Sequence, residues 1–261
     1  MATSAVPWTR SHTLSAFHLY TLLPFGKLHS RNPEIKQLAG WQGRTPNSLA
    51  MKLVNFASLD PVITGTGRAG LSGASNQDRA LWTELQSNWD QVAIEAANAY
   101  AKLALSHGVD ADTPLIEDAE PAPIEEGKTR SATVQVRVNQ ARFRKAILAS
   151  YDSTCCISGL SHERLLIASH IVPWSEDTKN RLNPQNGLCL SALHDKAYDL
   201  GLITVLPDYR IRVSKKLMNG KTDSFMAASL LRFDNQVINP PKKLKPAAVF
   251  LEAHAMKFGF L

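Results

Sequence analysis

The feature that most constrains the fold of this chain is an acidic, proline-bearing segment near its middle. Between residues 108 and 130 the sequence has seven Asp or Glu side chains against two Lys or Arg, together with three prolines. Such a stretch has too little apolar surface to form a packed core. The sequence therefore predicts a linker over residues 108–131, between an N-terminal domain (1–107) and a C-terminal domain (132–261).

The N-terminal domain carries the start signals of three short helices within residues 7–56. Apolar residues at helical spacing begin after Thr9, and Asn32-Pro33 and Thr45-Pro46 each place a capping side chain before a proline suited to the first helical turn. Three helices of this size form either a helix-turn-helix unit that contacts DNA or a plain scaffold, and the sequence leaves both open. The glycine- and serine-rich residues 57–75 predict a loop.

A long amphipathic helix is expected after Ser75, which begins a capping-box pattern with Asp78 and should end at His107-Gly108. Large apolar groups keep i+3 and i+4 spacing along it: Trp82, Leu85, Trp89, Val92, Ala96, Tyr100 and Leu103. Such a stripe must be buried, and packing within the chain is the first expectation. The alternative is burial against a second copy, which predicts a homodimer through the N-terminal half.

The C-terminal domain is basic and contains the cysteines. Residues 131–261 hold eighteen Lys or Arg against ten Asp or Glu, which favours a polyanionic partner such as DNA or RNA. Cys155, Cys156 and Cys189 are odd in number and two are adjacent, which argues against disulfides and for a cytoplasmic location. Their spacing is not that of a zinc site, so structural zinc is not expected. No apolar run approaches the roughly 20 residues of a membrane helix, so a membrane is not expected as a partner.

Residues with the chemistry of a hydrolase gather between residues 137 and 217. A helix, an apolar strand, an Asn-Gly turn and a short helix follow one another there, and three side chains stand at the strand end, on the turn and on the short helix: His170, Asn186 and His194. A β-hairpin closed by one helix can bring these side chains to one phosphate group. A neutral imidazole is suited to removing a proton from an attacking water. We therefore predict an α+β protein with an all-helical N-terminal domain and a phosphodiester-hydrolysing C-terminal domain.

These residues resemble the HNH endonuclease family, whose ββα-metal domain occurs in restriction enzymes, homing endonucleases and colicin nucleases. The matching motif is His170-Ile171-Val172-Pro173-Trp174, Asn186-Gly187-Leu188, His194 and Asp199-Leu200-Gly201. The resemblance implies that His170 is the general base, that Asn186 orients it through a hydrogen bond, and that His194 binds one divalent ion, Mg²⁺ or Mn²⁺. Many members have an Asp or His directly before the base, where this chain has Ser169. Further ligands implied at the metal are Ser169 and Asp199, with Asp195 as an alternative.

The same resemblance implies a bacterial restriction-type endonuclease that cleaves double-stranded DNA, with a restriction or defence role. Basic side chains around the motif are the candidates for DNA contact: Arg142, Arg144, Lys145, Arg181 and Lys196. Two alternatives stay open. One is a DNA-binding protein with a degenerate HNH fold, which Ser169 favours. The other is an RNA-cleaving HNH nuclease, because the same site can hydrolyse any phosphodiester that reaches it.

Overall fold

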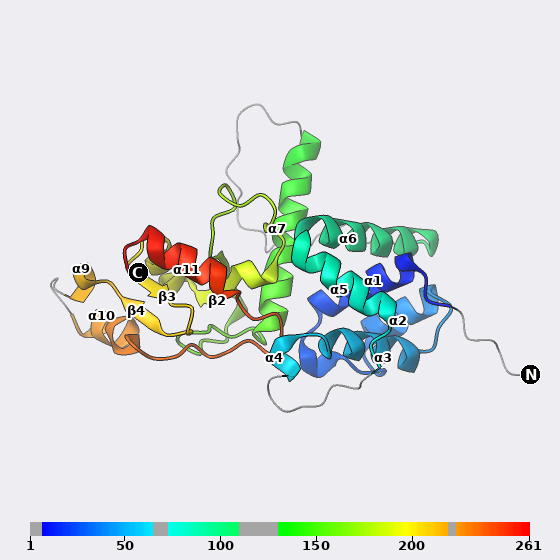
Figure 1. The fold of residues 1–261 in the computed structure, drawn as a ribbon, viewed down its shortest axis with the longest axis horizontal. Helices are drawn as coiled ribbons and strands as arrows, with labels where there is room; N and C mark the ends of the chain where they lie inside the picture. The colour runs from blue at the N-terminus through cyan, green and yellow to red at the C-terminus, as the bar shows by residue number, and fades with distance from the viewer. Residues whose placement is uncertain (1–6, 65–72, 110–129, 219–222) are drawn as a thin grey trace, which may run out of the picture.

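The computed structural model describes residues 7–64, 73–109, 130–218 and 223–261. It has an α+β architecture, in which N-terminal helices and a C-terminal region with short antiparallel strands lie on either side of a long central helix (Figure 1). The expected linker falls mostly on residues 110–129, outside the described ranges. Among the described helices, none is long and apolar enough to cross a membrane.

The N-terminal helices begin where the capping signals predict. The side chains of four residues each accept a hydrogen bond from a backbone N–H in the following first turn: Thr9, Asn32, Thr45 and Ser75. The helices are α1 (Arg10–Leu22), α2 (Pro33–Trp41), α3 (Pro46–Ala57), α4 (Pro61–Thr64), α5 (Asn76–Ser87) and α6 (Trp89–Ser106). Because α4 lies within the stretch expected as a loop, that expectation is wrong for residues 61–64.

The single long helix expected after Ser75 is two helices. Asn88 has φ −155° and ψ 74°, outside the helical region, so α5 ends before it and α6 begins after it. Much of the apolar stripe is buried: Leu85, Trp89, Val92 and Ala96. The helix α6 packs along α1, where the rings of Phe17 and Trp89 meet edge-on with centroids 6.1 Å apart. The stripe is therefore part of the chain's own core, which removes the argument for a homodimer through it.

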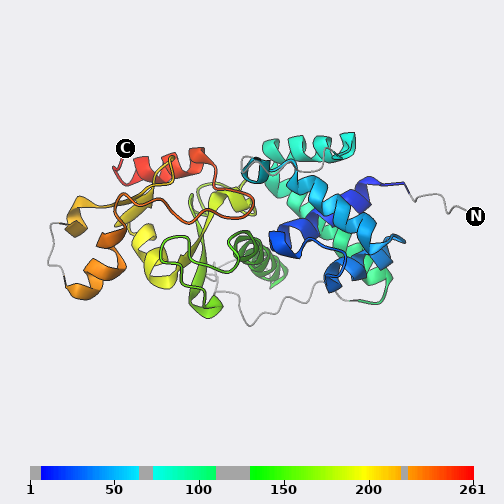
Figure 2. The same cartoon turned by 90° about the horizontal axis from the view of Figure 1, so that it is seen from below.

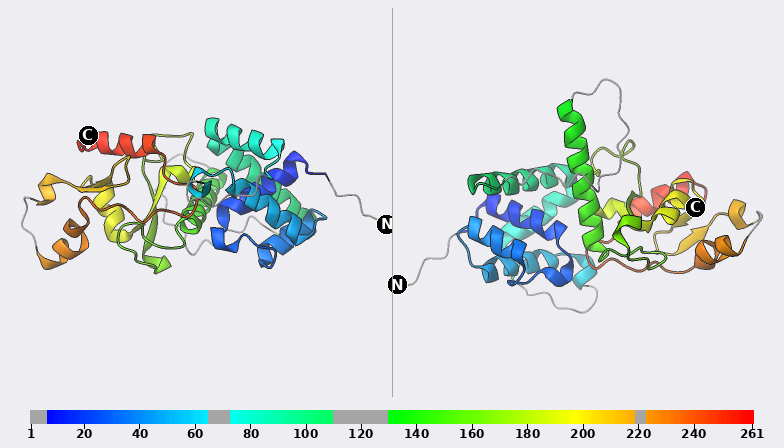
Figure 3. Two further views of the ribbon diagram at one scale, coloured as in Figure 1. Left: turned by 60° about the horizontal axis from the view of Figure 1, so that its bottom comes forward. Right: turned by 180° about the vertical axis from the view of Figure 1, so that it is seen from behind.

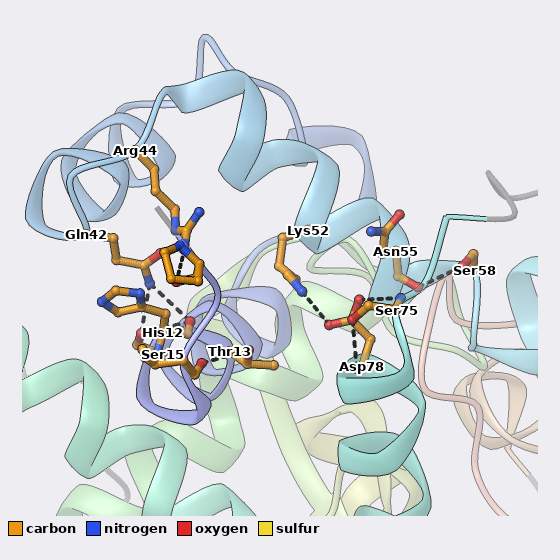
Figure 4. Close-up of polar contacts among 12 residues, drawn as sticks. His12, Thr13, Ser15, Gln42, Arg44, Lys52, Asn55, Ser58, Ser75 and Asp78 are labelled. Atoms are coloured by element: carbon orange, nitrogen blue, oxygen red, sulfur yellow. Dashed lines mark hydrogen bonds and ion pairs between the residues drawn. The ribbon is translucent and has the colours of Figure 1, made fainter. Parts of the chain in front are cut away.

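A buried ion pair joins α3 to α5 (Figure 4). Lys52 and Asp78 are both almost fully buried, and Nζ of Lys52 lies 2.6 Å from Oδ1 of Asp78. Oδ2 of Asp78 accepts the backbone N–H of Ser75 at 2.9 Å, and Ser75 Oγ accepts the N–H of Asp78 in return. One carboxylate thus completes the expected capping box and also neutralises the buried ammonium group.

The C-terminal region contains two antiparallel strand pairs within the described residues. β1 (Leu166–His170) pairs with β2 (Gly187–Ser191), and the register aligns His170 with Gly187. β3 (Ile203–Val205) pairs with β4 (Ile211–Val213), a pair that the sequence did not predict. The helices of this region are α7 (Arg130–Ser150), α8 (Ala192–Asp199), α9 (Lys215–Met218), α10 (Ser224–Ser229) and α11 (Ala248–Lys257).

The helix α7 lies between the N-terminal helices and the strands in every ribbon view (Figure 1, Figure 2 and Figure 3). It contacts α1 as well as β1 and β2, and buried side chains of both regions form one hydrophobic cluster. Gly187 permits the close approach of α7 to the hairpin, because a Cβ there would lie 2.5 Å from Ile147 and 2.7 Å from Phe143. Gly187 of the motif, the first residue of β2, therefore leaves room for α7 beside the strand end that carries His170.

Candidate active site

His170 ends β1 and faces α7. Its ring stacks on Phe143 with centroids 3.8 Å apart and planes 11° apart, and Trp174 meets it edge-on at 5.6 Å. Together with Ala168, which strand alternation places on the same face, these residues line a cavity of about 100 Å³. Burial lowers the pKa of His170 below 6.5, although a hydrogen bond with the Arg181 backbone opposes this shift. The ring is therefore neutral near pH 7.

A backbone carbonyl fixes the tautomer of this ring. Nε2 of His170 lies 2.9 Å from the carbonyl oxygen of Arg181, and such an oxygen can only accept a hydrogen bond. Nε2 therefore carries the hydrogen, and the lone pair is on Nδ1. A neutral imidazole held in one tautomer is suited to accept a proton at that atom.

Asn186 is fully buried, and its side chain binds backbone groups. Oδ1 accepts the N–H of Val172 at 2.8 Å, while Nδ2 donates to the carbonyls of Val172 at 3.1 Å and Asn180 at 3.3 Å. The expected hydrogen bond from Asn186 to His170 is thus replaced by the bond to Arg181. Asn186 instead fixes segment 171–186, which connects β1 to β2 and contains the carbonyl that binds the His170 ring.

His194 lies inside the fold, where both ring nitrogens have partners. It is 3% exposed, with Nε2 2.9 Å from the carbonyl of Ser229 and Nδ1 2.7 Å from the hydroxyl of Ser191. Because the carbonyl takes the Nε2 hydrogen, the Ser191 hydroxyl donates to the lone pair on Nδ1. Cys155 Sγ also lies 3.8 Å from Nδ1. The expected role of His194 as a metal ligand does not fit this environment, since no lone pair is left for an ion.

The other implied metal ligands carry oxygen atoms and lie on α8 and β1. Asp195 and Asp199 stand one helical turn apart on α8, and Asp199 is exposed. Desolvation raises the pKa of Asp199, with Lys196 and Lys257 opposing the shift. Ser169 is 3% exposed, its Oγ has no hydrogen-bond partner among the described residues, and strand alternation turns it to the face of β1 opposite His170. A buried hydroxyl without a partner is costly, so an additional ligand there would be stabilising.

This donor set fits a hard cation better than a zinc ion. The described residues contain no group of three or more His, Cys, Asp or Glu side chains placed to hold a metal. A Mg²⁺ ion needs no such cage, because it retains several waters and takes one or two carboxylates together with substrate phosphate. The carboxylates of α8 are of the ligand type that such an ion takes, whereas Ser169 lies on the other face of β1 from His170.

The basic candidates for DNA contact differ in their exposure and in the hydrogen bonds and ion pairs that their charged groups make. Arg144 donates to the carbonyls of Leu166 at 2.6 Å and Glu163 at 2.9 Å, which ties α7 to the start of β1. Arg181 donates from Nε to the carbonyl of Trp174 at 2.9 Å. The remaining candidates are Arg142, which is half-buried, Lys145, whose Nζ lies 3.6 Å from Glu34, and Lys196, which is exposed.

The site thus has a neutral histidine at the end of a β-hairpin and acidic groups on the helix that follows. Residues 155–206 match the family model described as HNH endonuclease. This segment holds β1, β2 and α8, and its match supports the HNH endonuclease family that the motif predicted. No curated protein gives a significant match to the chain.

Sequence reasoning missed the groups that hold the His170 ring. The Arg181 carbonyl belongs to the backbone and has no sequence signature. Phe143 stacks on the ring, and apolar spacing along a helix gives no sign of such a contact with a histidine.

Proposed function

We propose that this protein is a divalent-metal-dependent DNA endonuclease in which His170 is the general base. The observation that carries the proposal is the fixed tautomer of His170 within the matched HNH segment, since it leaves Nδ1 ready to accept a proton. The excess of Lys and Arg in residues 131–261 supports a nucleic acid as substrate. A role in restriction or defence is the biological setting that we propose for this activity.

In the proposed reaction, Nδ1 of His170 takes a proton from a water molecule as the water oxygen attacks phosphorus. The bond from phosphorus to the 3′ oxygen breaks, which gives a 5′-phosphate and, after protonation, a 3′-hydroxyl group. Phe143 and Trp174 pack around the His170 ring and keep it in place. The carboxylates of Asp195 and Asp199 on α8 would contribute to holding a Mg²⁺ or Mn²⁺ ion, which when bound would neutralise charge on the phosphate and the leaving oxygen.

Replacement of His170 by alanine tests the proposal. We expect the variant to lose at least about 100-fold in plasmid cleavage rate, the usual contribution of a general base, while its melting temperature stays near that of the wild type. His162→Ala is the matched control, because His162 is exposed and eight positions earlier in the same segment. Cleavage by His170→Ala at close to the wild-type rate would show that the base lies elsewhere.

The same assay separates the proposed substrate from the alternatives. Plasmid DNA and structured RNA are each incubated with wild-type protein and Mn²⁺ or Mg²⁺, with and without EDTA. We expect EDTA-sensitive cleavage of DNA. Cleavage of RNA alone would replace DNA as the substrate, and binding of DNA without cleavage under any of these conditions would indicate a degenerate site.

A further inference from the structure

The peptide group that binds His170 is itself held by a carboxylate of the N-terminal helices. Asp90, in the first turn of α6, accepts the N–H of Leu182 at 2.8 Å on Oδ1 and the N–H of Arg181 at 3.2 Å on Oδ2. The N–H of Leu182 and the carbonyl of Arg181 belong to one planar peptide group. That group therefore connects the Asp90 carboxylate on one side to Nε2 of His170 on the other.

We propose that Asp90 is a positioning residue for His170 and acts through the peptide between Arg181 and Leu182. The N–H and C=O of a trans peptide point in opposite directions, so a carboxylate that fixes the N–H also aims the carbonyl at the imidazole. A hydrogen bond to an anion polarises the peptide and makes its carbonyl a stronger acceptor. Asp90 thus holds His170 in the Nε2–H tautomer, as the aspartate of a catalytic triad holds its histidine directly.

The groups around the Asp90 carboxylate support a specific role for its bonds to the backbone of Arg181 and Leu182. Desolvation raises its pKa and Asp177 adds to the increase, while the backbone N–H groups of Leu182 and Arg181 and the charge of Arg181 oppose it. Asp177 in turn binds the same segment, accepting the N–H of Lys179 at 3.0 Å. An acidic residue in a first helical turn is often only a favourable partner of the helix dipole. Asp90 differs because its oxygens reach backbone groups 91 and 92 positions away in the chain.

The consequence is that the N-terminal helices complete the active site. The general base lies in the HNH segment, but the orientation of its ring depends on a residue outside the matched region, on α6. The proposal rests on the proposed function of His170 as the base. Its test therefore includes a measurement of the His170 ring that does not require cleavage.

The experiment compares Asp90→Ala and Asp90→Asn with Glu95→Ala in the full chain. Glu95 lies on the same helix, but its carboxylate binds Arg10 and Gln91. Groups that orient a metal-ligating histidine through its second nitrogen typically contribute about 10- to 100-fold in affinity or activity, and we take that range for the orientation of a base. We expect Asp90→Ala to lower kcat by that factor with KM within about 2-fold of wild type. Asp90→Asn, which keeps one acceptor oxygen, should lose less, and Glu95→Ala should keep wild-type kcat.

The second measurement is the ¹⁵N spectrum of the histidine rings in metal-free protein near pH 8, with the His170 signals assigned from a His170→Gln variant. We expect wild-type His170 to be the Nε2–H tautomer and Asp90→Ala to give a mixture of tautomers. If Asp90→Ala does not fold, Asp90→Asn supplies both measurements. An unchanged tautomer in the Asp90 variants, or a loss of kcat equal to that of Glu95→Ala, would overturn the proposal. Activity in His170→Ala would overturn the proposed function instead, and the tautomer would still decide the role of Asp90.

Discussion

Two histidines of one motif differ in chemistry because of what their ring nitrogens contact. At His170 a backbone carbonyl takes the Nε2 hydrogen, so Nδ1 holds the lone pair, and the residue lines the cavity beside α7. At His194 a carbonyl and a hydroxyl occupy both nitrogens, and the ring is almost fully buried. The first arrangement suits a base, whereas the second suits a residue that joins α8 to the end of α10.

The contrast leads to a prediction about metal binding. We expect Asp199→Asn and Asp195→Asn to weaken Mn²⁺ binding about 10-fold or more while unfolding stays near wild type. We expect His194→Ala to retain Mn²⁺ binding and to lose about 1–3 kcal/mol of stability for each buried polar partner left without a hydrogen bond. Calorimetric titration with Mn²⁺ and urea unfolding measure the two effects. Loss of Mn²⁺ binding in a folded His194→Ala protein would restore His194 as a ligand.

At the scale of helices and strands, the sequence predicted the features that depend only on residues close together in the chain, such as where helices begin. Thr9, Asn32 and Thr45 cap their helices through atoms two or three positions away, so the pattern alone is sufficient. The break at Asn88 was missed because the apolar spacing continues through it from α5 into α6. The contact of Asp90 with Leu182 was equally inaccessible, because it depends on how α6 packs against a distant segment.

The surroundings of His194 suggest a structural role for this part of the motif. Cys155-x-x-Ser158 and Ser191-x-x-His194 have the pair spacing of a structural zinc site. The fold brings the pairs together: His194 Nδ1 is near Cys155 and Ser191, and the N–H of Ser158 donates to Cys155 Sγ at 3.4 Å. Two of these four residues are serines, so hydrogen bonds hold the two pairs together in this structure.

This arrangement predicts that two substitutions create a zinc site. Ser158→Cys combined with Ser191→Cys would give three cysteines and one histidine, a common structural zinc set. We expect the double variant to bind one Zn²⁺ per chain by elemental analysis and to melt at a higher temperature with zinc than without it. Without zinc it should be less stable than wild type by about 1 kcal/mol, since Ser191 caps α8. A double variant that binds no zinc would show that the four side chains do not converge tightly enough.

At the scale of the whole molecule, the N-terminal helices and the C-terminal region also contact each other at a second place, away from the active site. A strap over residues 239–247 runs from the region of the strands to the C-terminal end of α1. Lys243 in this strap is fully buried, and its Nζ donates to the carbonyls of Tyr20, Thr21 and Leu23. These are carbonyls at a helix end, which lack partners within the helix and favour a cation. Leu244 adds a bond from its N–H to Asp60 Oδ2 at 2.7 Å.

The last prediction concerns the pH dependence of the contact between Lys243 and the end of α1. Burial lowers the pKa of Lys243 from 10.5 to about 7, with Asp60 and Asp152 opposing the shift. Between these values the unfolded chain binds more protons than the folded one, so the contribution of Lys243 to stability increases as pH rises and is constant below pH 7. Methionine cannot titrate. The stability of the wild type relative to Lys243→Met should therefore increase by up to about 1.4 kcal/mol for each pH unit between 7 and 9.

Urea unfolding of both proteins at pH 6, 7, 8 and 9 measures this difference, and groups that titrate in both proteins cancel from it. At pH 9 we expect Lys243→Met to be the less stable protein by at least roughly 1–3 kcal/mol, because buried carbonyls lose their donor. Difference values that stay constant from pH 6 to 9 would mean that the amine keeps its proton throughout. The carbonyls at the end of α1 would then hold Lys243 as an ammonium ion, and its contribution to stability would not change with pH.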